Sequence, residues 1–100
     1  MGKPLNRLEK HTQINNIWIY VLSLLKKRDL HAYTLNQEIK NKFGFKPSRI
    51  MMYLILYKLE EENMIESYLK ERRKYYKITK KGEEEIKKAK LYLTNLSKKI

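Results

Sequence analysis

Apolar side chains in the first quarter of the chain recur with the period of a helix. The positions lie three and four residues apart: Ile14, Ile17, Trp18, Val21, Leu22 and Leu25. This spacing predicts an amphipathic helix over about residues 12–27. Ile19, Tyr20 and Leu24 extend the apolar surface beyond one face. Because a chain of 100 residues can hardly bury such a helix on two sides by itself, the pattern indicates a partner subunit.

A second helix is predicted from Thr34 to Phe43. Its start matches a capping box. In this motif the Thr34 hydroxyl accepts a hydrogen bond from the Gln37 backbone amide, and the Gln37 side chain bonds back to the backbone amide of Thr34. Gly44 follows and tolerates the left-handed conformation that ends helices. Residues 30–33 are predicted to be a short extended link, and residues 44–47 the turn of a helix-turn-helix.

The third helix is predicted to begin at Ser48, whose hydroxyl can act as its N-cap, and to end before Asn63. Its core face carries apolar residues at helical spacing: Met52, Ile55, Leu56 and Leu59. A second apolar stripe, formed by Ile50, Leu54 and Tyr57, lies on the opposite face. Two interpretations of this stripe stay open, a second protein surface or packing against the C-terminal helix.

Two strands with a basic tip are predicted after this helix. Residues 64–70 and 75–79 have strand character, and the second run is rich in aromatic and β-branched side chains. The tip between them, residues 71–74, is charged. From Lys70 to Lys81 there are seven Lys or Arg residues and one Glu. A helix followed by such a hairpin is how a winged helix-turn-helix presents itself to DNA.

The last predicted helix runs from Lys80 to Ile100. Three glutamates near its start favour a helix N-terminus, because the helix dipole attracts negative charge there. Apolar residues then step by 3, 4, 3 and 4 positions: Ile86, Ala89, Leu93, Leu96 and Ile100. Such a heptad seam is typical of a helix that packs along another helix.

The predicted fold is mainly α with a small β-hairpin, in the α+β class. It is a winged helix-turn-helix followed by a long C-terminal dimerisation helix. Three parts are expected: an N-terminal arm over residues 1–11, a DNA-binding domain over residues 12–79 and the dimerisation helix over residues 80–100. The length allows one domain with a modest core.

Composition narrows the function classes. Lys and Arg outnumber acidic residues 23 to 11, and a net charge of +12 favours a polyanionic partner. With no Cys and two separated His, we expect neither a metal site nor a cofactor. No nucleophile, carboxylate pair or phosphate loop indicates an enzyme. Neither a membrane-spanning apolar run nor a signal peptide is apparent, so we expect a cytoplasmic protein without a membrane partner.

Three motifs together resemble the PadR family of winged-helix transcriptional regulators. Leu30 to Leu35 is similar to the segment between the family's first two helices. Tyr53 to Ile65 is similar to its recognition helix and exit. Arg73 to Gly82 is similar to its wing strand, where Arg-basic-Tyr-Tyr and Thr-x-x-Gly are typical. The resemblance covers about Ile14 to Gly82. Ala32 and Asn63 stand where the family usually has Gly.

The resemblance implies a homodimer that binds a pseudo-palindromic operator in double-stranded DNA and represses transcription. It also implies dimerisation through the C-terminal helix against the first helix of the partner. Family members often respond to small aromatic ligands, although no residue here indicates such an effector. The alternative is an architectural protein that coats DNA with little sequence preference, which the high charge and the apolar third helix favour.

The candidate DNA-binding residues lie at the start of the third helix and on the wing: Lys46, Ser48, Arg49, Met51, Tyr53, Arg72, Arg73 and Lys74. Arg49 can bond guanine through two hydrogen bonds. For Ser48, the role of helix cap is preferred to that of phosphate ligand. The Tyr53 ring can equally pack against the protein or contact phosphate. Arg73 can brace the wing by hydrogen bonding instead of contacting DNA. Lys40 and Lys42 are expected to flank the site.

The candidate dimer-interface residues come from the first and last predicted helices: Ile17, Trp18, Val21, Ile86, Ala89, Leu93, Leu96 and Ile100. For Trp18, a place in the core is preferred to a role in stacking on a ligand. The heptad seam and the two-sided first helix both indicate that these helices meet across two subunits.

Overall fold

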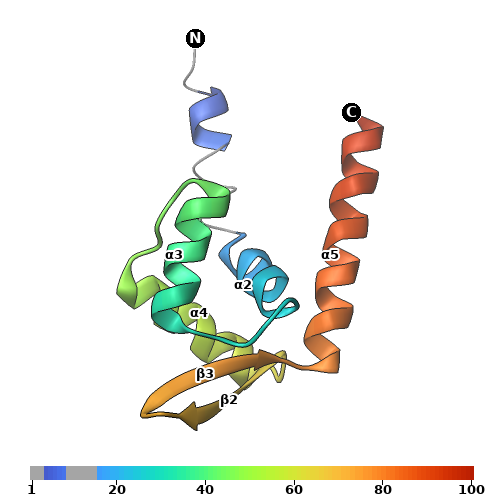
Figure 1. Ribbon diagram of the computed structural model, residues 1–100. Helices are drawn as coiled ribbons and strands as arrows, with labels where there is room; N and C mark the ends of the chain where they lie inside the picture. The colour runs from blue at the N-terminus through green and yellow to red at the C-terminus, as the bar shows by residue number, and fades with distance from the viewer. Residues whose placement is uncertain (1–3, 9–15) are drawn as a thin grey trace.

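The computed structural model describes residues 4–8 and 16–100 (Figure 1). Ile14, the predicted start of the first helix and most of the predicted arm lie outside these residues. Residues 4–8 form a short, exposed helical segment. The remaining elements are, in chain order, α2 (Ile17–Leu25), β1 (Leu30–His31), α3 (Ala32–Phe43), α4 (Arg49–Glu61), β2 (Ile65–Lys70), β3 (Arg73–Ile78) and α5 (Lys80–Lys99).

The predicted fold class is confirmed: the chain is mainly helical, with one small antiparallel sheet. Helices α2, α3 and α4 pack together above the sheet, and α5 rises along the other side of α2 (Figure 1). The sheet has three strands in the order β1-β3-β2, so the predicted two-stranded hairpin was incomplete. Leu30 pairs with Tyr76 and His31 with Tyr75. A strand of two residues is too short to show an alternating pattern, which explains the omission.

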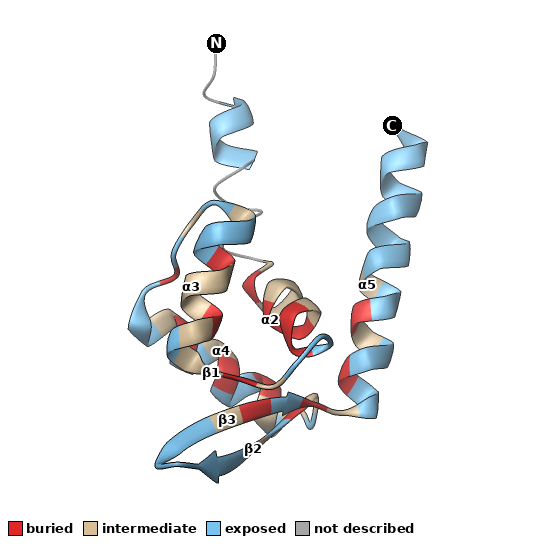
Figure 2. Cartoon of the chain, in the orientation of Figure 1, coloured by how far each residue is buried: buried red, intermediate tan, exposed pale blue. Residues whose placement is uncertain are grey.

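The core lies where α2, α3, α4, the sheet and the first half of α5 meet (Figure 2). Its members come from the predicted helix faces, with Leu30, Ile65, Tyr76 and Ile78 added by the sheet. In the hairpin, Ile65 pairs with Ile78 and Ser67 with Tyr76, so alternate residues of both strands face the core. One face of the wing therefore stabilises the helices, and the other faces solvent.

The caps explain where the helices begin and end. The predicted N-cap is confirmed at Ser48, whose Oγ accepts a hydrogen bond from the Met51 amide at 3.1 Å. Gly44, with φ of 85°, ends α3 as expected. The predicted capping box at Thr34 was wrong, because α3 begins two residues earlier, with His31 in the N-cap position. β1 leads directly into the helix, and the Thr34 hydroxyl contacts His31 Nε2 at 3.0 Å.

Helix α5 departs from the compact part of the molecule. Its first half packs on α2, whereas every residue from Lys90 onward is exposed (Figure 2). The Cα radius of gyration is 14.4 Å, above the value of about 13 Å expected for a compact chain of this length, because α5 projects. Among the described residues, no helix has the length and apolar character needed to span a membrane.

Four hydrogen bonds join the end of α4, the end of the wing and the start of α5. Asn63 ends α4 with a φ of 63°, as its sequence position predicted. The Thr79 amide donates to the Met64 carbonyl at 3.0 Å, and the Thr79 hydroxyl donates to the Asn63 carbonyl at 2.7 Å. Thr79 Oγ1 also accepts from the Gly82 amide at 3.1 Å as the N-cap of α5. Lys81 Nζ donates to the Glu62 carbonyl at 2.8 Å.

Gly82 makes this junction sterically feasible. A Cβ at this position would lie 2.2 Å from the Met64 carbonyl oxygen and 2.8 Å from Ile78 Cγ1. Neither neighbour can move freely, since one is backbone and the other belongs to the core. The first turn of α5 can approach the end of α4 this closely only with glycine.

We expect Gly82→Ala to destabilise the fold by about 1–3 kcal/mol, although alanine normally favours a helix over glycine by about 1 kcal/mol. Urea unfolding at fixed protein concentration measures the effect. Lys81→Ala is the matched control, because it removes one exposed hydrogen bond and introduces no clash. A Gly82→Ala variant as stable as the native protein would show that the junction is not tightly packed.

Candidate nucleic-acid interface

The N-terminus of α4 and the tip of the wing lie on the same side of the molecule. In Figure 1 both point away from α5, which stands on the opposite side. α4 crosses below α3 as the second helix of the helix-turn-helix, and its N-cap at Ser48 is exposed. This arrangement presents one face to a partner and leaves α5 free of it.

Two neighbouring hollows form this face. One, of about 490 Å³, lies between the starts of α3 and α4, and Lys46, Ser48, Arg49 and Tyr53 line it. The other, of about 640 Å³, lies between α3, α4 and the wing, and Tyr53, Arg73 and Lys74 line it. Ala32, Tyr33 and Tyr53 line both hollows, so they form one continuous surface.

This continuous surface is positively charged. Its lining includes four basic side chains, Lys46, Arg49, Arg73 and Lys74, and no carboxylate. The structure therefore brings together six of the eight residues predicted to contact DNA, including Ser48 and Tyr53. A concave surface with basic side chains and hydroxyl groups is suited to a phosphate backbone.

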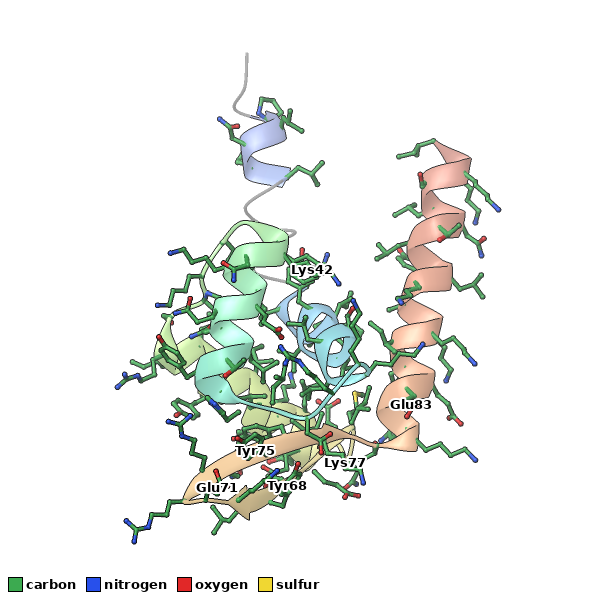
Figure 3. The ribbon with its side chains drawn as sticks, in the orientation of Figure 1. Lys42, Tyr68, Glu71, Tyr75, Lys77 and Glu83 are labelled. Atoms are coloured by element: carbon green, nitrogen blue, oxygen red, sulfur yellow. The ribbon has the colours of Figure 1, made fainter. Side chains whose placement is uncertain are left out.

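The wing tip is shorter than the sequence suggested. Strand β3 begins at Arg73, so only Glu71 and Arg72 form the turn, and Arg73 and Lys74 belong to the strand. Glu71 and Arg72 have φ values of 51° and 66°, the pattern of a type I′ turn. Glu71 lies at the far end of the hairpin in Figure 3. Arg72 is the basic residue that the turn itself presents.

Arg73 and Lys74 are held by neighbours on opposite faces of the sheet. Arg73 Nη1 lies 3.2 Å from His31 Nε2, which links the wing to the start of α3. Lys74 Nζ lies 3.7 Å from the Glu60 carboxylate and 5.5 Å from the centre of the Tyr76 ring. Burial is the main cause that raises the pKa of Tyr76, and Glu60 adds to it. Both cations are therefore positioned before any partner binds.

Aromatic stacking stiffens the solvent face of the wing. The rings of Tyr68 and Tyr75 stack at 5.8 Å, and His31 meets Tyr75 edge-on at 5.4 Å (Figure 3). The Tyr68 hydroxyl donates to the Asp29 carboxylate at 2.6 Å, and this hydrogen bond raises the pKa of Tyr68. These contacts connect β2, β3 and the loop before β1, and so they fix the direction of the hairpin.

Met51, one of the eight predicted contacts, and Lys42, which was expected to flank the site, both lie away from this surface. Met51 is half-buried on the other side of α4, where it lines a hollow together with Trp18 and Ile55. Lys42 lies near the end of α2, beside Lys27, and this neighbouring cation lowers the pKa of Lys42 (Figure 3). Both residues were assigned from their place in the sequence, and each falls on the face of its helix that turns away from the wing.

Sequence reasoning missed Tyr33 and Asn36, which line the hollow at the start of α4. The Tyr33 ring is exposed, and Asn36 Oδ1 is buried and has no hydrogen-bond partner among the described residues. The signal was present, since positions 33 and 36 lie one turn apart on the same helix face once α3 is known to begin at Ala32. The misplaced capping box concealed it.

The residues predicted for a dimer interface divide into three groups by burial. Ile17, Val21 and Ile86 are fully buried within the single chain, and this accounts for their apolar character without an interface. Trp18 and Ala89 are half-buried. Leu93 and Leu96 are exposed on the second half of α5, and Ile100 is exposed just after the helix ends. Among the described residues, no group of His, Cys, Asp and Glu side chains has the arrangement of a metal site.

Comparison with known proteins shows the family to which the chain is similar in sequence. The model of the transcriptional regulator PadR-like family matches residues 21–88. An uncharacterised protein of Lysinibacillus sphaericus is 32% identical over 85 residues, which span 78% of this chain and 72% of that protein.

Solved structures give the same result. A transcriptional regulator from Clostridium thermocellum is 30% identical, with a TM-score of 0.77 and 85% of each chain covered. A PadR family transcription regulator from Clostridium difficile is 28% identical, with a TM-score of 0.79, and the match covers 83% of this chain and 92% of the other.

Proposed function

Because the chain belongs to the PadR-like family of transcriptional regulators, we propose that it acts as a homodimeric repressor. In this proposal α4 enters the major groove of a pseudo-palindromic operator, and the wing contacts the adjacent backbone. The observation that carries the proposal is the continuous basic surface of α3, α4 and the wing, whose lining includes no carboxylate.

The contacts have different tasks in this proposal. Arg49, in the first turn of α4, reaches base edges, where its guanidinium can bond guanine twice. Arg72 at the wing tip and Lys46 before α4 meet phosphates, and phosphate contacts position a protein without reading sequence. Ser48 caps α4, and Arg73 braces the wing through His31.

The exposed half of α5 supports the dimer. Leu93 and Leu96 are each 43% exposed on a helix that continues beyond its own core. At the base of α5, a hollow of about 520 Å³ has a mainly apolar lining that includes Trp18, Met51 and Ile55. Three charged residues, Lys58, Glu62 and Glu85, also line it. An exposed apolar stripe and an apolar hollow in one chain suit a two-fold interface, where each subunit covers the other's apolar surface.

Replacing Leu93 by Glu tests the dimer. Burying the new carboxylates in the seam should weaken dimerisation by about 3 kcal/mol or more, which exceeds a hundredfold in Kd. Sedimentation at micromolar protein should show monomers. Leu91→Glu is the matched control, because Leu91 is exposed on the same helix but lies outside the seam. A Leu93→Glu variant that remains a folded dimer would exclude this seam from the interface.

Replacing Arg72 by Ala tests the wing. If the side chain of each subunit meets one phosphate, the salt slope of log K should fall by about 1.8, since each contact contributes about 0.9. The affinity for preferred and random duplexes should fall equally. Arg28→Ala is the matched control, because Arg28 pairs with Glu38 away from the basic surface. An unchanged slope for Arg72→Ala would show that the wing tip does not contact DNA.

The same titrations separate a regulator from an architectural protein. A sequence-specific regulator prefers its operator over random DNA by about 10³-fold or more. An architectural protein would bind both with similar affinity and similar salt dependence.

A further inference from the structure

The outward face of α4 is apolar, which is unusual for a helix beside a basic surface. Ile50, Leu54 and Tyr57 are 74%, 60% and 67% exposed. They lie opposite the buried side of the helix, which packs through Met52, Leu56 and Leu59. Their exposure shows that α5 of the same chain does not cover them. These side chains contribute little to the fold and are available to a partner.

The surroundings of this stripe indicate the chemistry of the partner. Arg49 precedes it on α4, and Lys46 lies just before the helix. Arg73 and Lys74 border the adjoining hollow. A purely apolar protein surface would leave these cations without counter-charges at its rim. The partner therefore carries negative charge at its edges, opposite these cations, and apolar groups between those edges, opposite the stripe.

The major groove of DNA meets this description. Phosphates line its edges, and the C5-methyl group of thymine is the apolar group on its floor. Facing Ile50 or Leu54, a G·C pair would leave polar groups without water or hydrogen-bond partners, which is costly. An A·T pair also carries polar atoms, but its thymine adds a methyl group that can make apolar contact with these side chains, and a G·C pair has no such group.

We propose that Ile50 and Leu54 read thymines through their methyl groups, so that each half-site is A·T-rich at the positions under the first two turns of α4. This inference rests on the proposed DNA-binding function and specifies its target. Tyr57 lies one turn further along, in a shallow hollow with Glu60 and Glu61. These carboxylates repel phosphates, so the base contacts fall in the N-terminal half of the helix.

The experiment compares thymine with deoxyuridine, which pairs identically and lacks only the methyl group. A preferred duplex is first selected from random sequences with the full-length protein. It is then resynthesised with deoxyuridine in both half-sites. Each contacted methyl should contribute about fourfold in affinity, from the value of about one buried methylene. Two contacts in each of two half-sites make four methyl groups, so the substituted duplex should bind roughly 200-fold more weakly.

Two variants locate the effect. In the double variant Ile50→Ala and Leu54→Ala, thymine and deoxyuridine duplexes should bind equally, because the groups that sense the methyl are gone. Both positions are exposed and alanine favours helices, so the variant should fold normally. Leu91→Ala removes an equally exposed leucine from α5 and should keep the full preference for thymine.

The outcomes are distinguishable. Equal binding of the native protein to both duplexes would overturn thymine reading, while leaving sequence-specific DNA binding intact. A double variant that still prefers thymine would assign the methyl contact to other residues and overturn the role of Ile50 and Leu54. A double variant with native DNA binding but altered self-association would make the stripe a protein interface. Absence of binding to any duplex would contradict the proposed function itself.

Discussion

The geometry of the molecule depends on the contact between Gly82 and the Met64 carbonyl. At this point the end of α4, the last strand of the wing and the first turn of α5 share hydrogen bonds through Thr79. A side chain on Gly82 would separate them, because its Cβ would overlap the Met64 backbone. The recognition helix, the wing and the proposed dimerisation helix are therefore held in one fixed relation. In a two-fold dimer, that relation sets the distance between the two recognition helices.

Charge and apolar surface are divided between the two ends of this framework. The starts of α3 and α4 and the inner edge of the wing bring four cations into neighbouring hollows. The opposite end exposes the apolar seam of α5, and the hollow beside Trp18 lies at its base. Arg73 lies beside His31 and Lys74 beside Glu60, so contacts within the same chain direct both side chains. The apolar stripe on α4 lies within the charged end, which is why its proposed partner is a base and not a protein.

The sequence predicted the elements whose physical signals are local and long. Helical spacing identified α2, α4 and α5, and the Ser48 and Gly44 caps followed from side-chain chemistry. It could not predict β1, because two residues carry no periodicity and their pairing with β3 is long-range. The two-residue wing turn was missed because Glu71 and Arg72 adopt left-handed conformations that usually require Gly or Asn. The sequence predicted most of the residues that form the proposed site. It could not predict that Met51 faces away from this site, because tertiary packing decides which side of α4 is covered.

Footprinting on a selected duplex tests the central claim, that a fixed two-fold dimer places two recognition helices on one DNA face. Two protected half-sites centred about 10 bp, or roughly 34 Å, apart are expected, because successive major grooves on one face have this spacing. Protection of one isolated half-site, or of opposite faces of the duplex, would contradict the account.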